Sequence, residues 1–314
     1  MTIEIKNLNI YFNEKTKLQA VNNLSFNVKK GEIMGLVGES GCGKSLTSLA
    51  IMRLLRKNAS FSGDINFLGE NLLNLSAKEM TSLRGREISM IFQEPLTALN
   101  PLHRVGKQIA ETLKIHTSLS KKERKEKTLE LMNEVNLKDL EDTYKKFPHE
   151  LSGGQRQRIV IAIAIACEPQ LIIADEPTTA LDVSTQTQII DLLKKLNNKK
   201  DHSLLFISHD LDLVGDLCHR IAIMYAGHIV EIIEKLKDAK HPYTKCLLDA
   251  IPSPLHKGKD LYSIPGRVPT LSERKSGCPF APRCPMAKEK CHEILPELLE
   301  KKDGHLVRCL YIYR

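Results

Sequence analysis

The sequence predicts an α/β protein built on a parallel sheet, and two patterns carry this prediction. First, a glycine-rich loop at residues 38–45 joins an apolar strand pattern at 33–37 to an apolar helix pattern at 46–52. Second, strand and helix patterns alternate again from Leu171, with strands at 171–174 and 204–208 and helices at 185–196 and 211–218. Such alternation is typical of helices that cover both faces of a parallel sheet.

Other parts of the chain do not follow this alternation. Short strands with alternating apolar residues are predicted at 3–10, 18–28 and 65–68, and amphipathic helices at 105–116 and 121–135. Residues 221–225 and 228–232 are predicted to form a hairpin around Ala226-Gly227. Beyond about Leu236 the chain becomes rich in proline, which indicates a separate, loop-rich appendage at its C-terminal end.

The glycine-rich loop fills every position of the pattern G-x-x-x-x-G-K-[ST], with the residues Gly38-Glu39-Ser40-Gly41-Cys42-Gly43-Lys44-Ser45. The glycines let the backbone curl, so that successive N–H groups point at phosphate oxygens beside the positive end of the next helix. We expect Lys44 to reach the β- and γ-phosphates and the Ser45 hydroxyl to ligate Mg²⁺. Cys42 occupies a variable position and is expected only to fill space. The loop predicts a nucleoside triphosphate site that includes all eight residues.

Four further segments place polar groups at the ends of predicted strands and helices. Asp175 and Glu176 follow the strand at 171–174; Asp175 is expected to hold Mg²⁺ through water, and Glu176 to polarise the attacking water. Gln93 and His209 end two other apolar strands and are expected to reach the γ-phosphate, Gln93 also the Mg²⁺. Ser152-Gly153-Gly154-Gln155 begins a helix whose N-terminus suits another phosphate. Each segment alone has an ordinary structural alternative, but together they predict ATP hydrolysis.

Composition narrows the class of protein. The chain has 314 residues, which is enough for two domains, and no apolar run approaches the ~20 residues that cross a bilayer. The N-terminus alternates like a strand instead of a secretory leader, so we expect a cytoplasmic protein. The net charge of +8 is densest at residues 121–127, where lysine and glutamate alternate as on a solvated helix face. The charge alone decides nothing, and no nucleic-acid partner is predicted.

In this order the motifs resemble those of the ATP-binding cassette (ABC) family, over roughly residues 1–235. The resemblance implies a RecA-like core, an antiparallel β-subdomain and an inserted helical subdomain at about 95–165. It also implies that Leu151–Gln155 acts in trans and completes the ATP site of a partner subunit, and that Ala180-Leu181-Asp182 connects the two sites. Phe12, with Tyr11 beside it, resembles the aromatic residue that stacks on adenine, although simple packing is the alternative.

Two more segments resemble one branch of this family. Gln93–Pro101 is similar to the run F-Q-[DE]-P-x-[ST]-[AS]-L-N-P of peptide and nickel importer ATPases, and His241–Lys245 resembles their H-P-Y-T-x segment. Residues 236–314 then resemble the C-terminal domain of dipeptide and oligopeptide importer ATPases. The resemblance implies a second, related ATPase subunit, two membrane permeases and an extracytoplasmic solute-binding protein, with this chain at the cytoplasmic face of the membrane. Leu96, Leu99 and Leu102 would face the permeases or fill the helical subdomain.

Four of the eight cysteines lie in the last 37 residues, at Cys278, Cys284, Cys291 and Cys309. Their spacing, C-x5-C-x6-C-x17-C, is not the C-x2-C pair of a zinc ribbon, and a reducing compartment argues against disulfides. A small domain with little apolar core usually needs a staple. We predict a structural [4Fe–4S] cluster, as the resemblance also implies, with zinc or reduced thiols as alternatives.

These features together predict an ATP-hydrolysing subunit that energises an importer of di- or oligopeptides. A nickel or metal-chelate importer is the close alternative, because the same motifs occur in that branch. A soluble ABC ATPase that acts on DNA or ribosomes is the distant alternative, since the chain has a single cassette without a long coiled coil or a zinc module inside it.

Overall fold

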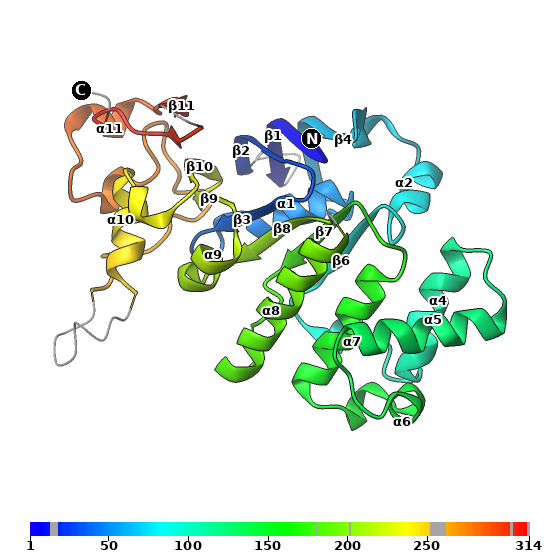
Figure 1. Cartoon of the computed structure of the whole chain (residues 1–314). Coiled ribbons are helices and arrows are strands. Elements are labelled where there is room, and N and C mark those ends of the chain that lie inside the picture. The colour runs from blue at the N-terminus through cyan, green and yellow to red at the C-terminus, as the bar shows by residue number, and fades with distance from the viewer. Residues whose placement is uncertain (13–17, 180, 201, 252–261, 302–303, 313–314) are drawn as a thin grey trace.

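The computed structural model describes residues 1–314 except 13–17, 180, 201, 252–261, 302–303 and 313–314. Figure 1 shows a central sheet flanked by helices, a smaller sheet near the N-terminus, a group of helices at one end and the C-terminal segment at the other. This arrangement confirms the predicted α/β class with an antiparallel β-subdomain and a helical subdomain. The domain boundary at residue 235 stays a prediction.

The larger sheet has eight strands within the described residues, in the order β11-β12-β10-β9-β3-β8-β7-β6. The five strands from β9 to β6 are parallel, and the remaining pairs at the other edge are antiparallel. The bounds are β3 Ile33–Val37, β6 Ile88–Ile91, β7 Leu171–Asp175, β8 Ser203–Ser208, β9 Arg220–Tyr225, β10 His228–Ile233, β11 Leu299–Glu300 and β12 Leu306–Val307.

The central strands are apolar throughout because each of their faces lies in a different core. In β8, Leu204 and Phe206 pack into the core that includes the helical subdomain, whereas Leu205 and Ile207 pack into the core beneath the smaller sheet. A strand that is buried on both faces reads as a continuous apolar run. The predicted strands at 33–37, 171–174 and 204–208 are therefore confirmed to within one residue.

The smaller sheet is antiparallel and has the order β2-β1-β4-β5. Its strands are β1 Ile3–Phe12, β2 Leu18–Val28, β4 Ala59–Phe67 and β5 Glu70–Asn71. Alternate residues of β1, such as Ile3 and Ile5, are buried against the larger sheet, as the period of two in the sequence predicts. This layer covers the side of the core sheet that carries the helix after the phosphate loop.

The helices fall into two groups by their place in the chain, and Figure 1 shows α4 to α7 gathered at one end of the molecule. Helices of the insertion between β6 and β7 are α3 Pro95–Ala98, α4 Val105–His116, α5 Lys121–Glu134, α6 Leu140–Lys145, η2 Pro148–Glu150 and α7 Gly153–Ile165. Those that flank the sheets are α1 Lys44–Ile51, η1 Leu72–Asn74, α2 Ala77–Leu83, α8 Val183–Lys200 and α9 Leu211–Leu217. The helix predicted at 105–116 has those same bounds in the structure, because a regular apolar stripe specifies a helix well.

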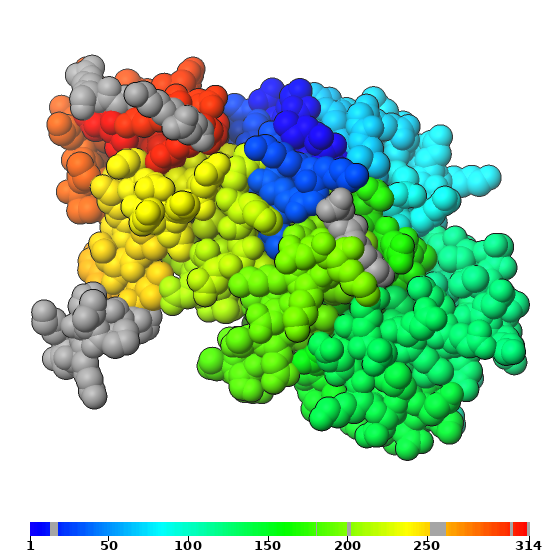
Figure 2. Space-filling view, in the orientation of Figure 1, coloured from blue at the N-terminus to red at the C-terminus, as the bar shows by residue number. Residues whose placement is uncertain are grey.

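The described residues of the C-terminal extension (236–314) include several that pack on the core, such as Tyr243 and Phe280. The extension contains η3 Leu236–Asp238, α10 Pro242–Asp249, η5 Ala281–Arg283 and α11 Glu289–Glu293, besides β11 and β12. β12 pairs with β10 through Glu231 and Ile232, so the extension adds strands to the larger sheet, which the sequence did not indicate. Figure 2 shows the orange and red atoms of the extension against the yellow atoms around α10 and beside the blue N-terminal region.

Candidate ATP site

The phosphate loop runs from the end of β3 to the start of α1, where its glycines are required by the backbone. Gly38 has φ 154°, and a Cβ atom there would lie 2.0 Å from the carbonyl oxygen of Met224. Gly43, with φ 114°, precedes the first residue of α1. Any L-residue at these two positions would therefore be strained or would clash.

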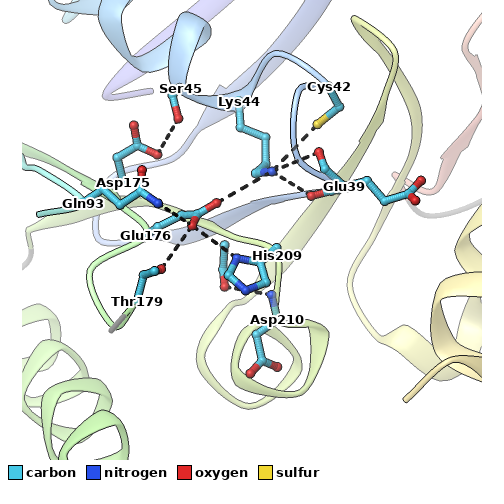
Figure 3. A network of polar contacts seen from close by, with 12 residues as sticks. Glu39, Cys42, Lys44, Ser45, Gln93, Asp175, Glu176, Thr179, His209 and Asp210 are labelled. Atoms are coloured by element: carbon cyan, nitrogen blue, oxygen red, sulfur yellow. Dashed lines mark hydrogen bonds and ion pairs between the residues drawn. The ribbon is translucent and has the colours of Figure 1, made fainter. Parts of the chain in front are cut away.

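Lys44 is held by the loop itself. Its side chain is 4% exposed, and its Nζ donates to the carbonyl oxygens of Gly38 at 2.7 Å and Glu39 at 3.3 Å (Figure 3). Ser40 and Gly41 are exposed at the top of the loop, whereas Cys42 is fully buried. Burial raises the pKa of the Cys42 thiol. A buried, protonated thiol is unreactive, which agrees with the predicted space-filling role of Cys42.

Asp175 ends β7 beside the predicted magnesium ligand Ser45. The Oγ of Ser45 donates to Oδ1 of Asp175 at 3.1 Å, and the Oγ of Ser48 donates to Oδ2 at 3.2 Å. Asp175 is 5% exposed, and burial raises the pKa of its carboxyl even though the two serine hydrogen bonds lower it. The sequence predicted Ser45 and Asp175 but not Ser48, which lies one helical turn after Ser45 and so faces the same carboxylate.

Glu176 joins the other predicted residues into one network, which Figure 3 shows from close by. Its Oε2 accepts hydrogen bonds from Nε2 of Gln93 at 3.1 Å and Oγ1 of Thr179 at 3.1 Å, and lies 3.2 Å from Nδ1 of His209. Its Oε1 lies 3.9 Å from Nζ of Lys44. The sequence patterns did not indicate Thr179, which follows Glu176 by three residues in the turn after β7.

The backbone of Glu176 explains why its carboxylate reaches so many partners. Its φ is 48°, which is rare for a residue with a side chain, and its N–H still donates to the carbonyl oxygen of Ile207 on β8. The chain therefore turns sharply at the end of β7 and directs the carboxylate across the ends of β6, β8 and the phosphate loop. Backbone strain of this kind is concentrated at functional sites.

Chemically, this edge of the sheet combines a loop for phosphates, a hydroxyl–carboxylate pair that suits Mg²⁺ and a carboxylate that is able to orient a water molecule. The ends of the parallel strands β3, β6, β7 and β8 supply these groups, as the general rule for open α/β sheets requires.

The structure does not bring the predicted Ser152–Gln155 segment into this network. Ser152 caps α7, since its Oγ accepts from the N–H of Gln155 at 3.3 Å while Oε1 of Gln155 accepts from the N–H of Ser152 at 3.0 Å. A Cβ atom on Gly153 would lie 3.5 Å from Leu181, and one on Gly154 would lie 2.7 Å from Thr185. The segment thus packs on the residues that follow β7, away from the phosphate loop.

Asp182 and the aromatic pair have local roles in the structure. Asp182 accepts from the N–H and the hydroxyl of Thr185 and caps α8, and these hydrogen bonds lower the pKa of its carboxyl. Ala180, from the same predicted segment, lies outside the described residues. Tyr11 and Phe12 are half-buried at the end of β1, where the Tyr11 hydroxyl accepts from Gln19. The adenine contact stays a prediction.

The four C-terminal cysteines line one cavity between α10, η5 and α11, with an almost wholly apolar lining; these residues are Cys278, Cys284, Cys291 and Cys309. Burial raises the pKa of Cys278, and raises that of Cys284 to about 11, so both thiols are protonated at neutral pH. Among the residues that the structure describes, no group of three or more His, Cys, Asp or Glu side chains is arranged to hold a metal ion. The iron–sulfur cluster therefore stays a prediction, although the four cysteines share this cavity.

Comparison with known proteins agrees with this geometry. The ABC transporter family matches residues 21–179, and the family described as "Oligopeptide/dipeptide transporter, C-terminal region" matches residues 230–291. The chain is 44% identical to the oligopeptide transport ATP-binding protein AppD of Bacillus subtilis over 98% of this chain and 95% of that protein. It is 43% identical to the dipeptide transport ATP-binding protein DppD of Escherichia coli, over 98% and 96% of the two chains.

Solved structures show the same fold. A dimeric structure of MJ0796, a bacterial ABC transporter cassette, superimposes with a TM-score of 0.67 at 30% identity, covering 74% of this chain and 98% of that one. Within the part of the chain that the structure describes, none of the helices has the length and apolar character needed to span a membrane. By its sequence relatives, its fold and the two matched regions, the chain belongs to the ABC transporter family of ATPases, as a member with the oligopeptide/dipeptide C-terminal region.

Proposed function

We propose that this ATPase energises the import of di- or oligopeptides, and that the cluster around Glu176 performs the hydrolysis. The single observation that carries the catalytic part is the convergence of Lys44, Gln93, Thr179 and His209 on one carboxylate at the end of β7.

In this proposal the phosphate loop and Lys44 bind the phosphates, and Ser45 and Asp175 would hold Mg²⁺ beside them. Gln93 and His209 contact the γ-phosphate, and Glu176 takes a proton from the attacking water or orients it. Mg²⁺ supplies charge neutralisation on the phosphates when it is bound. Residues Ser45 and Asp175 fit it, because they already place a hydroxyl and a carboxylate 3.1 Å apart at the loop.

The position of the Ser152–Gln155 segment supports action on the ATP of a second subunit. The segment does not join the polar network of its own chain in the structure, and the comparison cassette is dimeric. In the proposed dimer each ATP lies between the phosphate loop of one subunit and this segment of the other, so ATP binding favours closure. We propose a related but different ATPase as the second subunit. Ser152→Arg should abolish turnover while each subunit still binds ATP, and normal turnover in that variant would exclude the role in trans.

Peptides are preferred over nickel as the solute because the matched C-terminal region and the similar proteins are described as peptide transporters. The proposed assembly places the chain at the cytoplasmic face of the membrane, with two permeases and an extracytoplasmic solute-binding protein. Leu96 and Leu102 are 59% and 81% exposed, which supports contact with the permeases, whereas Leu99 is 2% exposed and belongs to the core.

The experiment that tests this function is uptake by intact cells of a labelled dipeptide, a labelled longer peptide and radioactive nickel. Each would be compared between wild type and a chromosomal Glu176→Gln strain. Loss of peptide uptake alone is the expected result. Loss of nickel uptake alone would replace the peptide proposal by the metal one, and three unchanged rates would overturn the import function.

We also propose that the four cysteines of the extension hold a structural [4Fe–4S] cluster, with zinc as the alternative occupant. The observation in favour is that all four thiols line one apolar cavity, which offers a soft, dry ligand set. Because thiols are protonated at neutral pH and must ionise to bind a metal, binding must release protons. Iron and acid-labile sulfide in anaerobically purified protein are expected. Protein that contains neither, and no zinc, would overturn the proposal.

A further inference from the structure

One arginine of the C-terminal extension reaches into the phosphate loop. The guanidinium of Arg283 donates from Nη1 to Oε2 of Glu39 at 2.8 Å and from Nη2 to Oε1 at 3.1 Å. The Arg283 side chain is 5% exposed and that of Glu39 is 30% exposed. A bidentate, largely buried pair of this kind is stronger and more directional than an ordinary surface salt bridge.

The guanidinium of Arg283 is also held by two carbonyl oxygens of the extension and by Tyr225 of β9. Its Nε donates to the carbonyl oxygen of Pro265 at 2.7 Å, and Nη2 also donates to that of Ile264 at 3.3 Å. Its Nη1 lies 3.3 Å from the hydroxyl oxygen of Tyr225, to which it donates. These hydrogen bonds fix the orientation of the guanidinium plane independently of Glu39. The contact therefore restrains the position of the Glu39 carboxylate in addition to neutralising its charge.

The backbone of Glu39 is held by the extension as well. Its N–H donates to the hydroxyl oxygen of Tyr243 at 3.1 Å. Tyr243 belongs to α10 and is fully buried. Its ring packs edge-on against Tyr225, with centroids 4.6 Å apart, and is tilted against Phe280 at 5.2 Å. Rings that are buried on several sides leave the Tyr243 hydroxyl little freedom to follow a displaced loop.

The remaining polar group of Glu39 contacts the lysine of the phosphate loop. Its carbonyl oxygen accepts from Nζ of Lys44 at 3.3 Å, beside the 2.7 Å hydrogen bond from Lys44 to Gly38. Figure 3 shows Lys44 between this end of the loop and Glu176. Glu39 thus connects the extension to the ammonium group of Lys44. Its side chain and N–H contact the extension, and its carbonyl oxygen contacts Lys44.

From these contacts we infer that Arg283 is a positioning residue of the ATP site, which holds Glu39 and thereby Lys44 in the geometry that binds phosphates. The C-terminal extension then sets the affinity of the cassette for ATP. This inference rests on the proposed phosphate-binding role of Lys44. Nothing in the pattern G-x-x-x-x-G-K-[ST] specifies Glu39, so the motif alone does not imply this coupling.

Arg274 provides a matched control, because it also connects the extension to the cassette without contacting Glu39. Its Nη1 donates to the carbonyl oxygens of Gln19 at 3.0 Å and Ala20 at 2.9 Å, both on β2. Substitution of either arginine by methionine removes the charge and keeps most of the apolar stem. A loss that arises only from looser attachment of the extension should therefore appear in both variants.

The experiment measures the Kd for MgATP, together with KM and kcat, in the full-length Arg283→Met, Arg283→Lys, Glu39→Gln and Arg274→Met variants. Arg283→Met is expected to raise Kd and KM about tenfold with kcat at saturating ATP within threefold of wild type. Lysine should restore part of the affinity, since it keeps the charge but not the bidentate geometry. The Arg283→Met/Glu39→Gln double variant should lose no more than Arg283→Met alone, because the two residues act as one unit.

Two results would overturn the inference: a Kd within threefold of wild type in Arg283→Met, or equal losses in Arg283→Met and Arg274→Met. If Arg283→Met does not fold, Glu39→Gln decides, because its side chain is partly exposed and the change is isosteric; an unchanged Kd there refutes the inference. Lys44→Ala separates this inference from the proposed function. If Lys44→Ala loses ATP binding and Arg283→Met does not, only the role of Arg283 is refuted. If Lys44→Ala binds ATP normally, the proposed ATP site itself is refuted.

Discussion

Glu176→Gln is the sharpest test of the catalytic arrangement, because it replaces one carboxylate oxygen by an amino group, which removes the charge and leaves the shape nearly unchanged. In the structure Oε2 of Glu176 accepts from Gln93 and Thr179 at 3.1 Å each, and a glutamine carbonyl is able to keep both hydrogen bonds. What the variant lacks is an oxygen that accepts a proton from water. Loss of a positioned general base costs about 10²- to 10⁴-fold in rate, and we expect kcat to fall within that range.

The same substitution should leave ATP binding intact or improve it. Oε1 of Glu176 lies 3.9 Å from Nζ of Lys44, and at an effective dielectric constant of about 20 this corresponds to an attraction of roughly 4 kcal/mol before desolvation is considered. Removal of the negative charge releases Lys44 for the phosphates and removes repulsion of the γ-phosphate. The variant should therefore accumulate as an ATP-bound, closed dimer.

The assay is steady-state phosphate release by the transporter complex, with equilibrium ATP binding measured on the same preparation. Glu234→Gln makes the same chemical change at an exposed position and should leave both quantities unchanged. A kcat of Glu176→Gln within threefold of wild type would refute the role of this carboxylate. A Kd raised tenfold or more would refute the electrostatic argument, even if kcat fell as expected.

Three further outcomes are expected at other sites. Lys44→Ala should raise the Kd for ATP at least tenfold in equilibrium dialysis, because the loop loses its ammonium group; unchanged binding would count against the loop. Asp175→Asn should weaken the activation of the ATPase by Mg²⁺. Because burial raises the pKa of Asp175, this activation in the wild type should be lost, as the pH is lowered, at a higher pH than for an exposed aspartate. Burial and nearby Arg308 lower the pKa of His228 from 6.5 to about 4 in the folded protein. Between these two pH values the unfolded chain binds more protons than the folded one. The free energy of unfolding therefore falls as the pH is lowered through this range, by up to roughly 3 kcal/mol. Urea titrations at pH 7 and 5 should show less of this loss in His228→Gln than in wild type or in the exposed control His149→Gln; equal losses in all three would refute it.

Sequence patterns predicted the core because the sheet is buried on both faces and its strands end in polar residues. Leu204–Ser208 and Ile33–Val37 contain continuous apolar residues that only a two-sided core accommodates, and both are strands. The hairpin around Ala226-Gly227 was predicted from an equally local pattern, and the structure confirms it. Both residues have positive φ, at 45° and 87°, as a two-residue turn between strands requires.

The sequence could not place residues whose role depends on tertiary contact. Ser48 and Thr179 belong to no conspicuous pattern, and each becomes visible only when its neighbour, Asp175 or Glu176, is fixed at the end of β7. Short strands are equally difficult, because two residues carry no periodicity. β12, Leu306–Val307, is paired with β10 by the fold of the extension and not by any local preference.

The variable positions of a motif are where this chain departs most from what the motif alone predicts. The glycines, Lys44 and Ser45 are required by phosphate binding, so their chemistry follows from the pattern. Glu39 is under no such constraint, and in the structure its carboxylate, N–H and carbonyl contact three different partners: Arg283, Tyr243 and Lys44. Because two of these partners belong to the extension, the phosphate loop and the C-terminal domain form one packed unit. A change in the extension should therefore be detected first as a change in ATP affinity, before any change in the rate of hydrolysis.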